Sequence, residues 1–206
     1  MSDFDLYVRT PAAVSGPVPL RAEPGNPPAI IVGAPLCEMG PAALRFVAAR
    51  ALRLTATHLD TLLALPVEEA GALLVGIIRQ SVPDYRHAEV RDALVDIEAA
   101  RLERLIPRKL KPQVLPFAVE SAGTFDLAAL YGAVRDGANA TGLLAAADLP
   151  AALQVVLALS GSNTSPAAAK SGLTVAAILA NPEALALLRF ALSDSYDNLS
   201  RALEDG

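Results

Sequence analysis

The chain has 206 residues, of which 53% are hydrophobic and 19% charged, and this balance predicts a folded rather than a disordered protein. Its net charge of −5 speaks against nucleic acid as a partner, because phosphate binding needs a concentrated positive field. Aromatic residues make up only 4%, so we expect a core of Ala, Leu and Val between closely packed helices. The mean hydropathy of +0.40 indicates buried contact with another domain or subunit.

The sequence also carries information on the compartment of the protein. Cys37 is the only cysteine, which leaves neither an intrachain disulfide nor a cysteine-based metal site. The first residues of the sequence include acidic side chains and no apolar run, so we do not expect a signal peptide. The most apolar stretch, 143–159, is interrupted by Asp148 and Pro150, so we expect no membrane span. These features predict a cytoplasmic protein.

In chain order, the β-rich part comes first. Three strands are predicted over 6–10, 18–23 and 29–33, where β-branched or alternating residues are bounded by Gly, Pro and Asn. Helical periodicity begins at Pro41 and continues to the end of the chain. The pattern predicts an α+β fold that is predominantly helical, with a small N-terminal β-sheet.

Several helices can be placed by their periodicity and their capping residues. The first runs over 41–55, and its predicted inner face consists of Leu44, Val47, Ala48, Ala51 and Thr55. A charged amphipathic helix is expected over 87–105, with Val90, Leu94, Ile97 and Leu102 or Leu105 on its buried side. Capping side chains are expected at Thr124, at Asp148 and, followed by Pro182, at Asn181.

Two stretches resemble a known family. The strand and helix AIIVGAPL (29–36) and PAALRFVAARAL (41–52), followed by RDGANATGL (135–143), are similar in order to the HExxH zinc metallopeptidases of the gluzincin type. The resemblance is to heat-shock and prenyl-endopeptidase-like members, in which the helix carries HExxH and a downstream helix carries ExxAD. It implies a zincin-like helical core after the sheet, with Ala138 and Gly142 retained from the second motif.

The chain departs from that family at the catalytic positions. Arg50 and Leu54 stand where the two histidines would be, and Ala51 stands where the glutamate base would be. Arg135 takes the place of the ligand glutamate and Asn139 that of the aspartate. A catalytic zinc needs three protein ligands, an open water position and a base, whereas arginine stays protonated and repels a cation. His58 and His87 lie outside this frame, so the resemblance implies a pseudoenzyme without metal or cofactor.

A second resemblance concerns the C-terminal part. The stretches 141–153 and 188–196 are similar to the C-terminal region of large tetratricopeptide-repeat proteins from high-GC bacteria, where a degenerate peptidase-like domain follows helical repeats. This implies a metallopeptidase-like domain over 1–145 and a helical extension over 146–206 that packs on it. The implied partner is another protein or a neighbouring repeat domain of the same polypeptide, and homo-oligomerisation stays open.

Three functions follow from these patterns. The first is a non-catalytic protein-interaction or structural module of a larger bacterial scaffold. The second is a regulatory domain that binds an anion or small ligand in the vacated metal cleft, through Arg50 and Arg135. The residues expected to line this cleft are Arg50, Ala51, Leu54, Arg135 and Asn139. The third is an enzyme with an unrecognised site. The competing interpretation of the two arginines is structural: each pairs with a local acid such as Asp136, or extends to water.

Overall fold

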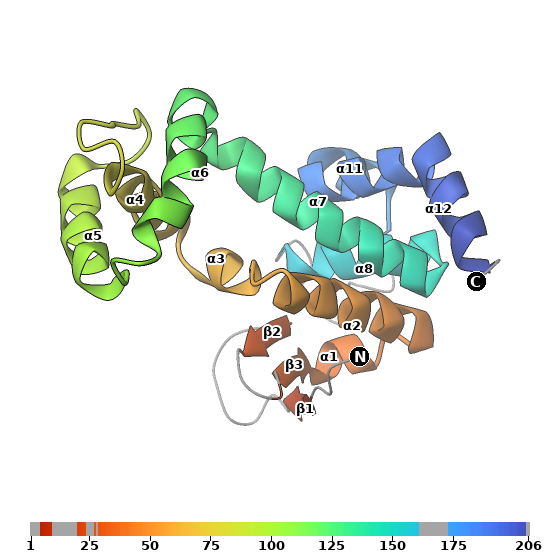
Figure 1. Cartoon of the computed structure of the whole chain (residues 1–206). Helices are drawn as coiled ribbons and strands as arrows, with labels where there is room; N and C mark the ends of the chain where they lie inside the picture. Colours follow the sequence, from red (N-terminus) through yellow and green to blue (C-terminus); the bar gives the residue numbers. More distant parts are fainter. Residues whose placement is uncertain (1–4, 10–19, 24–26, 28, 161–172, 205–206) are drawn as a thin grey trace. The chain divides into compact units, whose positions relative to one another are not determined.

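The computed structural model describes residues 5–9, 20–23, 27, 29–160 and 173–204 (Figure 1). The described chain is predominantly helical with a small sheet near the N-terminus, as the sequence predicted. By its internal contacts the chain divides into unit 1, residues 1–60 with 132–206, and unit 2, residues 61–131. The predicted division into a metallopeptidase-like domain over 1–145 and a helical extension over 146–206 rests on the family resemblance and stays a prediction.

The N-terminal sheet belongs to unit 1 and has the strand order β1-β3-β2. The strands are β1 (Asp5–Arg9), β2 (Leu20–Glu23) and β3 (Ala29–Gly33). β1 runs parallel to β3 and β2 runs antiparallel to it. Ile30 and Val32 of β3 are buried, as alternate residues of a strand with one face on the core should be. The three predicted strands are confirmed over the residues that the structure describes, and residues 10, 18 and 19 of the predicted strands lie outside these.

The helices of unit 1 follow the sheet and return after residue 131. They are α1 (Ala34–Cys37), α2 (Pro41–Ala56), α8 (Leu149–Leu159), α10 (Val175–Ala180), α11 (Pro182–Ala191) and α12 (Asp194–Glu204), and α7 (Leu127–Ala146) continues from unit 2 into unit 1. Asp148 accepts a hydrogen bond from the Ala151 N–H at 3.0 Å, and Asn181 accepts one from the Ala184 N–H at 3.0 Å. Both predicted caps are thereby confirmed.

The core of unit 1 joins β3, α2, α8 and α11, and it also includes the C-terminal part of α7. The inner face of α2 differs from the predicted one: its buried residues are Ala43, Phe46, Val47, Ala51 and Leu54. Leu44, Ala48 and Thr55 are only partly buried. Val47 and Ala51 are buried as predicted, whereas the prediction was wrong for the other three residues and left out Phe46, the largest fully buried side chain among the described residues.

One glycine lets α7 approach α2 closely. A Cβ atom placed on Gly142 would lie 2.8 Å from Cδ2 and 2.9 Å from Cε2 of Phe46, and 2.9 Å from the Phe46 carbonyl oxygen. Contacts this short are not tolerated, so any side chain here would force the two helices apart. The glycine thereby fixes the spacing at which the polar side chains of α2 and α7 meet.

The secondary-structure elements of unit 2 are all helices. It contains most of α3 (Asp60–Ala64), and all of α4 (Val67–Arg79), α5 (Asp92–Leu105) and α6 (Lys111–Thr124). α5 begins at Asp92 instead of His87, and its buried residues are Val95 and Leu102. Ile97, predicted on the buried side, is 64% exposed. Val90 and Leu102 are buried as predicted, but Val90 lies in the loop before Asp92, and counting this loop as helix placed Ile97 on the wrong side of α5.

The boundary between α6 and α7 corrects a further expectation. Thr124 is the last residue of α6 and does not cap the next helix. Asp126 does so, with its Oδ1 accepting a hydrogen bond from the Ala129 N–H at 2.9 Å. None of the helices described is long and apolar enough to cross a membrane.

Candidate functional site

The two motif segments of α2 and α7 meet at a hydrogen bond. Nε of Arg50 donates to Oδ1 of Asn139 at 2.8 Å, across 89 positions of sequence. Asn139 is only 1% exposed, so this bond satisfies a polar group that water does not reach. The structure therefore brings together two of the positions that the sequence comparison singled out.

A third helix completes this cluster. Glu183 lies in the first turn of α11, and its Oε2 accepts a hydrogen bond from Nδ2 of Asn139 at 3.3 Å. Its Oε1 lies 3.2 Å from Nη1 of Arg135, which forms an ion pair with it. Arg135 and Asn139 share one face of α7 because they are four residues apart. We call Arg50, Arg135, Asn139 and Glu183 the α2–α7–α11 cluster.

Sequence reasoning missed Glu183. The pattern Asn181-Pro182-Glu183 indicated a helix start, and an acidic residue in a first turn is usual there without any distant partner. A local acid such as Asp136 was one expected partner of Arg135, and the structure shows an ion pair of Arg135 with Glu183, 48 positions further along the chain. No local spacing rule connects residues so far apart, so the fold alone supplies this contact.

Burial shifts the pKa of Arg50 in the cluster and that of Asp136 beside Arg135 in the sequence. Desolvation lowers the pKa of Arg50, while the carboxylate of Glu183 raises it and the positive charge of Arg135 lowers it further. The intrinsic pKa of a guanidinium is so high that Arg50 still carries its proton at neutral pH. Partial desolvation, and then the charge of Glu183, raise the pKa of Asp136. The cluster can hold hydrogen bonds and balance charge, but its arginines cannot act as a general base.

The two remaining candidate positions of α2 are apolar and buried. Ala51 is 1% exposed and Leu54 is 6% exposed, and both pack within the interior of unit 1. In the metallopeptidase pattern these positions would hold the catalytic base and the second metal ligand. In this chain they contribute packing and no polar atom.

The two histidines of the chain lie outside the helices. His58 is exposed and follows the end of α2, where its φ of 55° puts it in the left-handed region. The ring of His87 packs edge-on against Phe125, with centroids 5.2 Å apart. Among the residues that the structure describes, no three His, Cys, Asp or Glu side chains are grouped closely enough to hold a metal ion.

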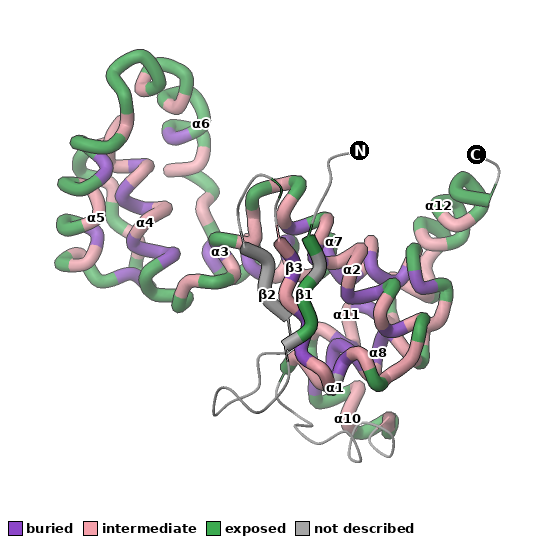
Figure 2. The backbone as a smooth tube through the Cα atoms, turned by 90° about the horizontal axis from the view of Figure 1, so that it is seen from below, coloured by how far each residue is buried: buried purple, intermediate pink, exposed green. Residues whose placement is uncertain are grey.

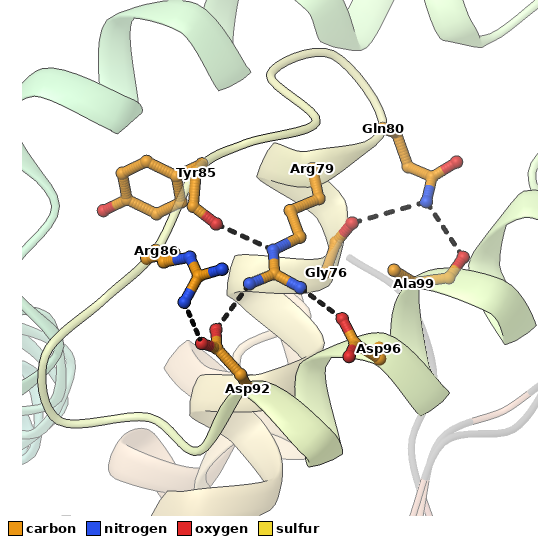
Figure 3. A network of polar contacts seen from close by, with 8 residues as sticks. All are labelled: Gly76, Arg79, Gln80, Tyr85, Arg86, Asp92, Asp96 and Ala99. Carbon is orange, nitrogen blue, oxygen red and sulfur yellow. Dashed lines mark hydrogen bonds and ion pairs between the residues drawn. The ribbon is translucent and has the colours of Figure 1, made fainter.

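Unit 2 has a polar cluster of its own, centred on Arg79 (Figure 3). The Arg79 guanidinium donates to the Tyr85 carbonyl oxygen at 2.7 Å, and it forms ion pairs with Asp92 at 2.6 Å and Asp96 at 2.5 Å. Arg86 adds a second ion pair to Asp92 at 2.9 Å. These contacts hold the loop between α4 and α5 against the start of α5. This cluster was not predicted from the sequence.

Comparisons with known proteins do not assign the chain to a family. No protein-family model matches it, and it has no match among the curated proteins or the solved structures. The resemblance of 29–52 and 135–143 to HExxH metallopeptidases therefore stays a prediction from the sequence motifs.

Proposed function

We propose that this chain is a non-catalytic, zincin-like domain that serves as a protein-interaction or structural module of a larger bacterial scaffold in the cytoplasm. The observation that carries the proposal is the hydrogen bond between Arg50 and Asn139. In the metallopeptidase pattern these positions belong to the two helices that form the zinc site. Here an arginine and an amide join those helices directly, with Glu183 as the third member.

The chemistry of the replaced positions supports a structural role. A catalytic zinc site keeps an open coordination position for water and places a carboxylate beside it. At the corresponding positions Ala51 and Leu54 are packed side chains, and Arg50 and Arg135 are cations. The hydrogen bonds and the ion pair between α2, α7 and α11 stabilise one arrangement of these helices. A domain that presents a fixed surface to a partner needs such an arrangement.

The metal content of the full chain tests the non-catalytic half of the proposal. The protein is purified without chelator and without a metal-affinity column, and its zinc is measured by elemental analysis. Cleavage of unfolded casein is then followed with added zinc, with and without chelator. We expect no stoichiometric zinc and no chelator-sensitive cleavage. Stoichiometric zinc together with such cleavage would overturn the proposal.

One observation favours the second candidate, an anion-binding regulatory domain. The described contacts of Arg50 use Nε alone, so its terminal nitrogens make no hydrogen bond to any described residue. A carboxylate or phosphate could bind to them, although Glu183 already supplies negative charge to Arg50 and Arg135. Thermal melting with millimolar phosphate, citrate and chloride separates the two functions. The second candidate predicts stabilisation by one anion that Arg50→Lys abolishes, and the first predicts equal effects on both proteins.

A further inference from the structure

The strand β1 is an open edge of the N-terminal sheet. It pairs with β3 on one side, and no strand among the described residues pairs with its other side. The opposite edge strand, β2, lies beside α2 (Figure 1). The short helix α1 follows Gly33, whose partner in β1 is Arg9, so it lies at the end of the sheet. Because an edge strand presents backbone N–H and C=O groups for pairing, β1 is a template for one more strand.

The side chains of β1 are poorly covered on both faces of the sheet. Val8 is in register with Val32 of β3 and so lies on the same face, but Val8 is 57% exposed while Val32 is 2% exposed. Tyr7 lies on the other face and is 55% exposed. Figure 2 shows exposed residues, in green, along β1. The core therefore covers β3 and ends before β1, which leaves apolar side chains of the edge strand uncovered.

The charges of β1 match those of a second β1 that runs in the opposite direction. The strand reads DLYVR, with an acid as its first residue and a base as its last. In an antiparallel pair centred on Tyr7, Asp5 of each copy stands opposite Arg9 of the other. Residues directly opposite in such a pair have Cβ atoms about 4.5–5.5 Å apart, so opposite charges attract and like charges destabilise. The strand is therefore complementary to itself at both of its ends.

Other arrangements of two β1 strands lack this match. A parallel pair in register would place Asp5 opposite Asp5 and Arg9 opposite Arg9, which are like charges. An antiparallel pair shifted by one residue would put the core face of one sheet beside the outer face of the other. The charges and the two faces of the sheet thus select the antiparallel pair centred on Tyr7.

We infer that two copies of this chain associate through β1, in an antiparallel pair that joins their sheets. The joined sheet has the strand order β2-β3-β1-β1-β3-β2. Val8 of each copy stands opposite Leu6 of the other on the core face, and the two Tyr7 residues meet on the outer face. Both copies use the same surface, so the association closes at two and leaves neither β1 edge free. The inference goes beyond the proposed function and does not depend on the cluster at Arg50.

Charged residues on an edge strand have a competing interpretation, because they can also prevent pairing with other chains. Like charges at both ends of β1 would prevent self-pairing in either direction. Asp5 and Arg9 prevent only the parallel arrangement and favour the antiparallel one. The protective interpretation predicts a monomer that no rearrangement of these two charges converts into a dimer, and the experiment below separates the two.

Sedimentation velocity of the full chain, at rising protein concentration, measures the association. We expect the wild type to form a dimer and nothing larger. Asp5→Arg and Arg9→Asp should each be monomeric over the same concentrations, because both cross-strand ion pairs then become pairs of like charges. The double substitution Asp5→Arg with Arg9→Asp should dimerise again, and so should a mixture of the two single variants. In both cases each acid again meets a base.

A disulfide tests the register of the pair. All variants carry Cys37→Ser, so that the introduced cysteine is the only one. The two residues at position 7 face each other with Cα atoms about 4.5–5.5 Å apart, within reach of a disulfide. Tyr7→Cys should therefore form a covalent dimer under oxidising conditions. Val8→Cys is the control, because its two copies would lie roughly 8 Å apart, beyond that reach.

Arg53→Asp is the matched charge control, because Arg53 is exposed on α2 and its reversal changes the net charge as much as Arg9→Asp does. It should leave the dimer unchanged. Circular dichroism of every variant should match the wild type, which shows that loss of association is not loss of fold. A monomeric wild type overturns the inference, as does a dimer that survives either single charge reversal. A double variant that stays monomeric, or equal cross-linking of Tyr7→Cys and Val8→Cys, overturns it as well.

Discussion

The two units each contain an arginine cluster that ties helices together, but water reaches the two clusters to different degrees. In unit 2 the Arg79 side chain is 12% exposed while its partners Asp92 and Asp96 are 44% and 70% exposed. In unit 1 Arg50 bonds to Asn139, which is 1% exposed. The Arg79 cluster lies outside the two sequence stretches that resemble metallopeptidases, and its contacts hold the loop between α4 and α5. It shows that this chain uses arginine for structure, which supports the same interpretation of Arg50.

The largest effect is expected at Arg50. Arg50→Met should lower the free energy of unfolding by about 3 kcal/mol, because it leaves the buried oxygen of Asn139 without a donor and removes a cation beside Glu183. Urea denaturation followed by circular dichroism measures the change. The matched control is Arg53→Met on the same helix, where the side chain is exposed and the change should stay within about 0.5 kcal/mol. Equal losses for both variants would remove the distinction between buried and exposed arginines.

The close approach of α7 to α2 gives the next largest effect. Gly142→Ala should cost about 2 kcal/mol, because the new methyl group would meet both the ring and the carbonyl oxygen of Phe46. Gly137→Ala lies on the same helix with no atom within 4 Å of the added Cβ, and it should stabilise by up to about 1 kcal/mol through helix propensity. Thermal melts of the two variants should shift in opposite directions. A shared direction would contradict the packing described here.

The unit 2 cluster should be less costly to break. Arg79→Met should lower the free energy of unfolding by about 1 to 2 kcal/mol, because the exposed carboxylates regain water when their partner is lost. The Tyr85 carbonyl loses its donor at the same time, so amide exchange should become faster in the loop 80–91. A loss as large as that of Arg50→Met would show that exposure does not separate the two clusters.

A substitution at the C-terminal end of α2, outside both clusters, is expected to stabilise the protein. α2 ends in a Schellman motif, in which Leu59 N–H donates to the Leu54 carbonyl oxygen at 3.0 Å and His58 N–H to that of Thr55 at 3.1 Å. His58 has a φ of 55°, where glycine is favoured. His58→Gly should stabilise by about 1 kcal/mol, and His58→Ala should not. Stabilisation by both would point to the removed imidazole instead of the backbone.

The smallest effect concerns pH. The folded state raises the pKa of Asp136, first through partial desolvation and then through Glu183, so the folded protein holds this proton more tightly than the unfolded chain. Stability therefore decreases as pH rises from the ordinary carboxyl pKa through the raised one. Asp136→Asn should remove this decrease and stabilise at pH 7 by no more than about 0.5 kcal/mol. Melting curves of both proteins between pH 4 and pH 7 give the comparison, and parallel curves would contradict the sign.

Local patterns in the sequence predicted the local parts of the fold. The caps at Asp148 and Asn181 were correct because a cap and its helix lie within a few residues of each other. The three strands were correct because their alternation and flanking turn residues are also local. The start of α5 was wrong because the apolar spacing continued through a loop that Arg79 holds in place.

The candidate site was predicted only in part, for the same physical reason. The motif frame brought Arg50 and Asn139 to attention, and the structure places them 2.8 Å apart. Glu183 could not be found, since its contacts with Asn139 and Arg135 span 44 and 48 positions and depend on how α11 packs. Ala51 and Leu54 were expected to line a cleft, but their burial makes them part of the core.

A double-mutant cycle on Arg50 and Asn139 tests the central claim most directly, namely that the cluster is a structural link between α2 and α7. The free energies of unfolding of the wild type, Arg50→Met, Asn139→Leu and the double variant are measured in urea. The account predicts a coupling energy of about 2 kcal/mol, with the double variant more stable than the sum of the single losses implies. Additive losses, within about 0.3 kcal/mol, would contradict it, because two side chains that stabilise the fold through each other cannot act independently.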